Sequence, residues 1–242
     1  MTQDVETAGV QATWTQEPPQ RTRGRAAAPR ERVPWWRGAW AVAFAVLVVF
    51  NLIWALPTYL TFDPALSRIP LSPNFPGHLH YPTVVIHAIT GNVTMVTGFL
   101  QLLPWLRRRS VRFHRVSGWL YVFAGALPAA LLGLALLPFS QAPTGRVGLF
   151  GMAVAWIVTT VQGYRMQRAH RYAEHRRWMY YSFALALGTS WGRVVVIFMG
   201  ITGVQFDMML FLEAISWGWV LNVLVAKWLV ERRRRRPARA AA

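Results

Sequence analysis

The sequence predicts an all-α integral membrane protein, a six-transmembrane-helix bundle with both termini in the cytoplasm. Two observations predict this fold class: six long apolar runs, and the gathering of positive charge in alternate gaps between them. Each run holds about 20 residues, which is the length that a helix needs to cross the hydrocarbon core of a bilayer. The runs lie near residues 39–60, 82–103, 116–137, 146–166, 178–200 and 208–230.

The basic residues predict the orientation of these helices. Of the 26 Lys and Arg residues, 23 lie before the first run, in the second and fourth gaps, or after the sixth run. Loops rich in Lys and Arg stay in the cytoplasm, so these segments define the inner side. Tryptophans near the inner ends of the runs fit the aromatic belt at a membrane surface. They are Trp36, Trp40, Trp105, Trp119, Trp178 and Trp228.

The chain divides into three expected parts. Residues 1–33 are rich in Gln, Thr, Pro, Ala and Arg, and this composition predicts a disordered basic cytoplasmic arm. Residues 34–230 form the six-helix transmembrane domain, and residues 231–242 form a polybasic cytoplasmic tail. Because the formal net charge of +17 alternates with the spans, we expect it to fix orientation and meet anionic lipid headgroups rather than nucleic acid.

Several classes of chemistry find no support in the sequence. Cysteine is absent, which excludes disulfides, thiolate zinc sites, iron–sulfur clusters and covalent haem attachment. The sequence has no H-E-x-x-H motif and no close carboxylate pair. Residues 188–192 match G-x-S-x-G, but they lie inside an apolar run rather than after a predicted strand, so they form no nucleophile elbow. We therefore expect no hydrolase and no metal site. We find no inverted repeat and no clear helix break within a run, features that are typical of many transporters.

A first polar site is expected in the outer half of the bilayer. His87 lies near the outer end of the second run, Arg193 lies in the fifth run, and Glu213 lies in the sixth. Counted from the ends of their runs, the three residues have similar depth. An ionisable residue inside a membrane is a candidate functional residue by default. The alternative is that an Arg193–Glu213 pair only locks the last two helices together.

A second polar site is expected at the inner boundary. His114 opens the third run and His175 opens the fifth, with Gln101 and Arg115 close by. Two histidines on different helices at matching depth are what bis-imidazole ligation of a haem requires. The alternative is that they are interfacial polar residues beside arginine-rich loops, where a histidine costs little.

The order and spacing of several motifs resemble a known family. The segments are His87-Ala-Ile-Thr-Gly91, Gly98-Phe-Leu-Gln101, Phe113-His114-Arg115-Val-Ser-Gly118-Trp-Leu-Tyr121, His175-Arg-Arg-Trp178-Met179, Arg193, and Trp217-Gly-Trp-Val-Leu-Asn222. From about residue 40 to 230 the chain resembles the bacterial membrane proteins grouped as domain of unknown function 2306. The resemblance implies a bacterial inner-membrane location and signature positions at His87, Gln101, His114, Arg115, His175, Trp178, Arg193 and Asn222. It implies no reaction.

Three functions remain open on the sequence. The first is a redox membrane protein that binds haem b or a quinone through histidines at helix ends, with His87, Gln101, His114, Arg115 and His175 as the candidate cofactor-binding residues. The second is a non-catalytic assembly or sensory protein. The third is a small proton-coupled transporter that uses His87, Arg193 and Glu213. The sequence does not decide whether the protein is an enzyme.

Overall fold

The apolar runs form long helices because a backbone in hydrocarbon must satisfy its own hydrogen bonds. The computed structural model describes residues 36–67, 71–75, 77–140, 144–188, 190–205 and 207–240. The expected arm at residues 1–33 lies outside the described residues. The described helices are α1 (Trp36–Leu60), α2 (His80–Leu102), α3 (Pro104–Arg109), α4 (Val111–Trp119), α5 (Leu127–Leu136), α6 (Arg146–Arg168), α7 (Tyr172–Ala186), α8 (Ser190–Thr202), α9 (Met208–Ser216) and α10 (Gly218–Ala240).

Five described segments are long and apolar enough to cross a membrane. They are His80–Leu102, Val111–Phe139, Arg146–Arg168, Tyr172–Thr202 and Met208–Arg232. The prediction of an all-α integral membrane protein is therefore confirmed. The first expected crossing corresponds to α1, whose described apolar portion, Ala39–Ala55, is shorter than the other five.

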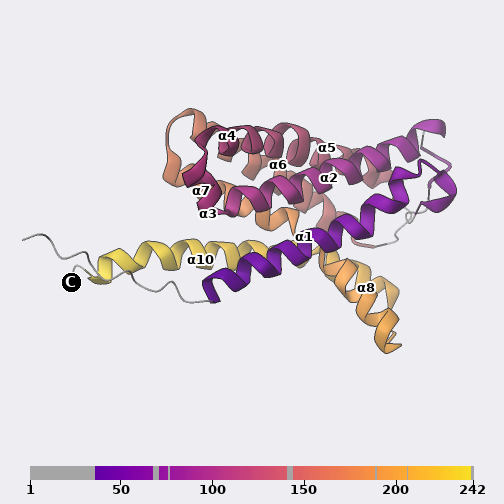
Figure 1. The fold of residues 1–242 in the computed structure, drawn as a ribbon. Helices are drawn as coiled ribbons and strands as arrows, with labels where there is room; N and C mark the ends of the chain where they lie inside the picture. The colour runs from indigo at the N-terminus through magenta and orange to yellow at the C-terminus, as the bar shows by residue number, and fades with distance from the viewer. Residues whose placement is uncertain are drawn as a thin grey trace, which may run out of the picture.

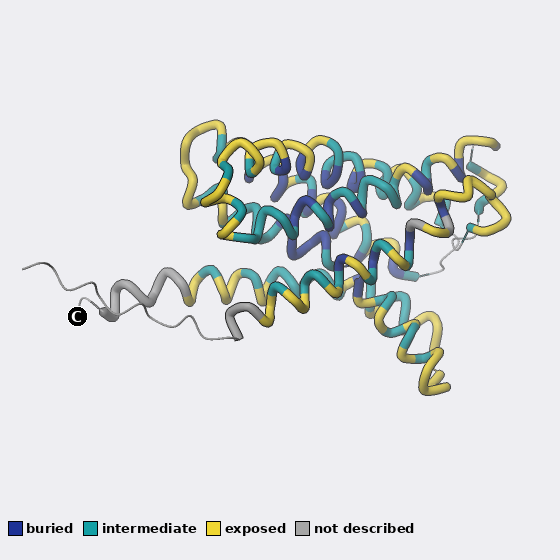
Figure 2. Tube along the Cα trace, in the orientation of Figure 1, coloured by how far each residue is buried: buried dark blue, intermediate teal, exposed yellow. Residues whose placement is uncertain are grey.

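A four-helix bundle forms the centre of the molecule. Figure 1 shows α2, α4 with α5, α6 and α7 packed side by side, while α1 and α10 run along one flank. Around this ring, α2 packs on α5, α5 on α6, and α6 on α7, so that α5 and α7 lie on a diagonal. Side chains at the centre are buried (Figure 2), among them Tyr121, Ala126 and Leu185.

The third run is continuous but not uniformly α-helical. Between α4 and α5, residues Leu120–Ala126 form a π-helix, and a 3₁₀ turn at Leu137–Phe139 ends the segment. A π-helical stretch widens the helix locally and is frequent at functional sites. Within it, Gly125 allows close packing, because a Cβ at this position would lie 3.1 Å from the backbone of Thr94 in α2.

The fifth and sixth runs are each broken into two helices, which the sequence analysis did not expect. α7 ends at Ala186 and α8 begins at Ser190, and Figure 1 shows α8 leaving the bundle in a new direction. α9 likewise ends at Ser216, and α10 begins at Gly218. The two breaks pack closely against each other. A Cβ at Gly188 would lie 2.8 Å from the Cβ of Trp219, and one at Gly218 would lie 3.3 Å from Trp191 Cδ1.

The α8–α9 hairpin projects from the bundle with exposed apolar side chains. Ile201 is 80% exposed and Leu210 is 73% exposed. Figure 2 shows this hairpin mainly as exposed or intermediate. Since apolar faces are stable against lipid, this pattern is typical of helices that lie in a bilayer.

Candidate functional site

A cavity of about 600 Å³ lies between α1, α2, α5, α6, α7 and α8. Its walls are mainly apolar, and polar side chains line it from three helices and from the turn after α5. They are Asn51 of α1, His80, His87 and Asn92 of α2, Arg193 of α8, and Ser140, which follows the 3₁₀ turn after α5. Cavities of this size are typical of small-molecule sites, which combine apolar walls with a few placed polar groups.

His87 has a fixed orientation in this cavity. Its Nδ1 lies 2.9 Å from the backbone oxygen of Ala129 in α5. Because a carbonyl oxygen only accepts hydrogen bonds, Nδ1 carries the proton, and Nε2 of the neutral ring has a free lone pair. Gly133, one turn further along α5, makes room for the ring, since a Cβ there would lie 3.3 Å from His87 Cε1.

Arg193 lines the same cavity and is held by Asn51. The guanidinium donates a hydrogen bond to Asn51 Oδ1. The amide of Asn51 donates in turn to the backbone oxygen of Leu47 at 2.7 Å and, at 3.5 Å, approaches Ser190 Oγ in α8. The two ends of the Asn51 amide therefore join α1 to α8. Sequence reasoning missed Asn51, although it is the one amide side chain in the first run.

His80 completes the polar groups at the end of the cavity. The backbone N–H of Ser72 donates to His80 Nδ1 at 2.9 Å, so Nε2 of the neutral ring carries the proton. The ring stacks on Phe75, with 4.8 Å between ring centroids. His80 is therefore a hydrogen-bond donor where His87 is an acceptor.

Glu213 does not join Arg193 as the sequence suggested. Its Oε2 accepts from the backbone N–H of Gly145 at 2.7 Å, and its Oε1 accepts from Trp217 Nε1 at 2.8 Å. Gly145 is the N-cap of α6 and has a φ of 84°. A carboxylate at this position satisfies an N–H at the helix start and favours the positive end of the helix dipole. Glu213 thus holds α9 against the start of α6, away from the cavity.

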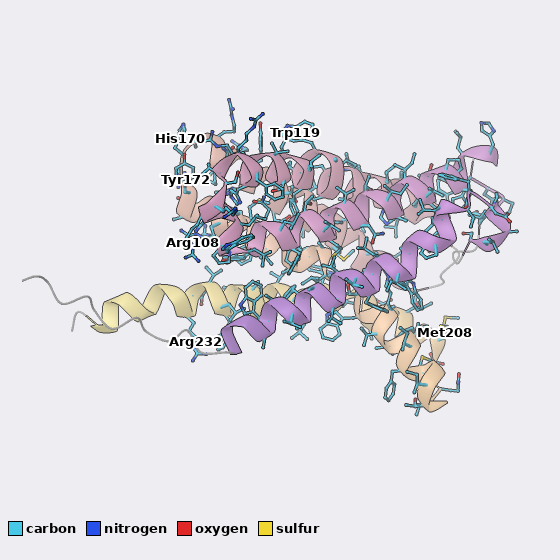
Figure 3. All side chains as sticks on the ribbon, in the orientation of Figure 1. Arg108, Trp119, His170, Tyr172, Met208 and Arg232 are labelled. Carbon is cyan, nitrogen blue, oxygen red and sulfur yellow. The ribbon has the colours of Figure 1, made fainter. Side chains whose placement is uncertain are left out.

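The expected inner residues gather at the end of the bundle that carries the arginine-rich loops, here called the arginine-rich end. Figure 3 shows Arg108, His170 and Tyr172 at this end, whereas Met208 lies far from it on the α8–α9 hairpin. Gln101 Nε2 donates to the backbone oxygen of His114 at 2.8 Å and to Ser117 Oγ at 2.6 Å. This pair of bonds fixes the start of α4 against the end of α2.

The two histidines at this end lie on different helices, His114 on α4 and His175 on α7. His175 Nδ1 lies 2.8 Å from the backbone oxygen of Gly163 in α6, which leaves Nε2 free. His114 is half-buried. Arg115 is exposed. The structure therefore joins Gln101 to the backbone of His114, places His175 against α6 at the same end of the bundle, and leaves Arg115 at the surface.

Three buried hydroxyls lie between the cavity and the arginine-rich end. Tyr121 OH and Ser182 Oγ are 2.7 Å apart, and Ser182 Oγ is 2.7 Å from Thr160 Oγ1. None of the three side chains is more than 1% exposed. They connect α6, α7 and the π-helix across the centre of the bundle.

The remaining signature positions have packing roles. Asn222 accepts from Trp191 Nε1 at 2.9 Å and donates to the backbone oxygen of Ala184 at 3.1 Å, so it joins α10 to both α8 and α7. Trp178 lies under the guanidinium of Arg177, 5.6 Å from ring centroid to Cζ. Among the described residues, no group of three or more His, Asp or Glu side chains is placed to hold a metal ion.

A helical bundle with several apolar segments long enough to cross a membrane defines a multi-pass membrane protein. The chain belongs to the family described as predicted membrane protein (DUF2306), whose sequence profile matches residues 84–230, more than half of its length. The resemblance drawn from the histidine motifs is therefore confirmed. Neither a curated protein nor a solved structure matches the chain.

Proposed function

We propose that this protein binds a membrane quinone in the cavity that contains His87 and Arg193. The observation that carries the proposal is the cavity itself, about 600 Å³ with mainly apolar walls and oriented polar groups at its edge. A quinone has an apolar ring and tail and two carbonyl oxygens that accept hydrogen bonds. The cavity offers the matching surfaces.

Each polar group has a distinct part in this binding. The guanidinium of Arg193 and the Nε2–H of His80 are donors for the carbonyl oxygens of the quinone. His87 Nε2 is the acceptor for a hydroxyl of the reduced quinol, because its Nδ1 proton is bonded to Ala129. A site with both donors and an acceptor recognises the oxidised and the reduced ligand.

We propose further that α1 completes six crossings and that both termini lie in the cytoplasm of a bacterial inner membrane. The arginine-rich end would then face the cytoplasm, where anionic headgroups attract Lys and Arg. In this orientation the cavity lies in the outer half of the bilayer. A quinone would enter it from the lipid rather than from water.

Equilibrium binding of a short-tailed benzoquinone to the detergent-purified protein tests the proposal. We expect saturable binding near one ligand per chain. His87→Ala and Arg193→Gln should each weaken binding by about tenfold, which is what the loss of a hydrogen bond worth about 1.4 kcal/mol produces. His78→Ala is the matched control, because His78 is exposed and lies outside the cavity.

Two results would overturn quinone binding. One is the absence of saturable binding by the wild-type protein, and the other is equal affinity of wild type, His87→Ala and Arg193→Gln. Quinone that co-purifies with the wild-type protein, and does so in a smaller amount with His87→Ala, would support quinone binding independently.

Proton-coupled transport is the second candidate, and the breaks between α7 and α8 and between α9 and α10 favour it. Discontinuous helices commonly form substrate sites in transporters. Arg193 lies on one of these helices and lines the cavity. Transport of a solute into proteoliposomes, driven by a pH gradient and lost in Arg193→Gln, would favour this function over quinone binding.

A further inference from the structure

We propose that the cavity opens sideways into the hydrocarbon between α1 and α8, and that the isoprenoid tail of a membrane quinone lies in this side opening, against Val196. The inference rests on the proposed function and extends it, because it assigns a place to the part of the ligand that the polar groups do not bind. The ligand is then a long-tailed quinone of the bilayer rather than a small quinone from water.

One wall residue locates the side opening. Among the described residues that line the cavity, Val196 alone is exposed, at 45%, while the others are buried or half-buried. A side chain that belongs both to the wall of a cavity and to the outer surface marks the place where the two meet. The cavity therefore reaches the surface of the protein at α8.

The packing of the helices explains why the side opening lies here. α1 packs mainly on α2, and α8 packs mainly on α9. The amide of Asn51 joins α1 to α8 at one level, where it accepts from Arg193 and approaches Ser190. Val196 follows Arg193 by three residues, so it lies near the same face of α8 and about 4.5 Å further along its axis. In this direction α8 leaves the bundle (Figure 1), which separates it from the cavity walls.

The surface around the side opening is apolar. On α8, Val194 is 45% exposed and Phe198 is 49% exposed, and on α1, Ile53 is 67% exposed. α8 also belongs to a segment that is long and apolar enough to cross a membrane, Tyr172–Thr202. Exposed apolar patches of this kind mark contact with a membrane. The side opening therefore leads into lipid.

The inside of the cavity suits the ring of the quinone, and the side opening suits its tail. Several wall residues are small, which leaves room for a flat ring. They are Ala88, Gly91, Ala129, Ala130, Gly133 and Ala153. A ring whose carbonyl oxygen accepts from Arg193 lies about one turn of α8 from Val196, so a chain on that ring reaches the side opening. An isoprenoid chain is favoured there, because burial of apolar surface provides its binding energy.

The test is equilibrium binding of benzoquinones that share one ring and differ in tail length, from no tail to four isoprene units, to the detergent-purified full-length protein. Each ligand is compared between variants, so its partition into the micelle cancels. Val196→Trp should weaken binding of the tailed quinones by about tenfold, because the indole fills the side opening. The affinity of the tail-less quinone should stay the same. Val194→Trp is the matched control, because Val194 is an equally exposed valine of α8 that does not line the cavity.

Helical content and elution volume show whether each variant folds. If Val196→Trp does not fold, Val196→Phe is compared with Val194→Phe in the same way. Equal affinities of the Val196 and Val194 variants for the tailed quinones overturn the side opening, and so does an equal loss of the tailed and tail-less ligands in Val196→Trp. In both cases wild-type binding of the tail-less quinone leaves the proposed function intact. Failure of the wild type to bind any quinone overturns the proposed function and the place of the tail together.

Discussion

The hydrogen bonds among Tyr121, Ser182 and Thr160 predict a change of sign in the effect of one substitution. Ser182 is bonded to both of the others, so it is the central member of the group. In the wild type, Tyr121→Phe removes one bond and leaves Ser182 satisfied by Thr160. The expected cost in the free energy of unfolding is about 0.6–1 kcal/mol, the range for one hydrogen bond between membrane helices.

Ser182→Ala should cost more, because it leaves the buried Tyr121 O–H without an acceptor, and the neighbouring indole N–H of Trp156 can only donate. An unsatisfied buried hydroxyl costs about 1–3 kcal/mol. Thr160 also loses its bond across helices, worth about 0.6 kcal/mol, although its hydroxyl can turn to its own backbone. The total is roughly 2–3 kcal/mol. Once Ser182 is Ala, however, Tyr121→Phe removes the orphaned hydroxyl and should restore about 1 kcal/mol.

The free energy of unfolding is measured for the wild type, Tyr121→Phe, Ser182→Ala and the double variant, which together form a double-mutant cycle. The assay is reversible unfolding in mixed detergent micelles, followed by circular dichroism. Thr159→Ala is the matched control, because Thr159 is a buried neighbour whose hydroxyl bonds only to its own helix, at Ala155 and Trp156. The reasoning is refuted if Tyr121→Phe destabilises the protein equally in both backgrounds. It is refuted equally if Ser182→Ala costs no more than Thr159→Ala.

Three further outcomes are expected. Gly98→Ala should lower the free energy of unfolding by about 1–3 kcal/mol, because its Cβ would overlap the ring of Phe183. Gly91→Ala should be neutral or stabilising, since nothing lies within 4 Å of its Cβ. Equal effects of the two substitutions in a thermal unfolding assay would contradict this. Glu213→Gln should cost about 0.3–1 kcal/mol by removing the charge at the start of α6, and unfolding of the variant should become less salt-dependent than that of the wild type. Binding of detergent-purified protein to nanodiscs of anionic lipid should exceed binding to zwitterionic discs, and the difference should shrink as salt rises; a salt-independent preference would argue against a role for the arginine-rich loops.

The sequence predicted the depth of the polar residues better than their partners. His114 and His175 were expected at one boundary, and each lies at the arginine-rich end, because each opens an apolar run there. Arg193 and Glu213 were also placed at matching depth, yet Glu213 bonds to Gly145 and Trp217 while Arg193 bonds to Asn51. Hydropathy fixes where a residue lies along the membrane normal. It carries little information on which neighbouring helix the side chain faces.

The helix breaks were hidden for a related reason. Gly188 lies at the first break and Gly218 directly after the second, but glycine is frequent in membrane helices and does not by itself predict a break. At the two breaks, residues distant in the sequence are in contact, namely Trp219 with Gly188 and Trp191 with Gly218. Such contacts cannot be read from the sequence of either run. The cavity was missed for the same reason, since its walls come from six helices.

The reciprocal packing of these tryptophans and glycines links the two ends of the α8–α9 hairpin to each other. The hairpin joins the rest of the protein at two adjacent breaks, near Gly188 and Gly218. Asn222 of α10 bonds to Trp191 of α8 and to Ala184 of α7, so it connects the two breaks. A rotation at one break would therefore disturb the contacts at the other. Because Arg193 lies on α8, a displacement of the hairpin would change the distance between the guanidinium and His87. A change in the surroundings of the exposed apolar hairpin would thus be felt at the polar groups of the cavity.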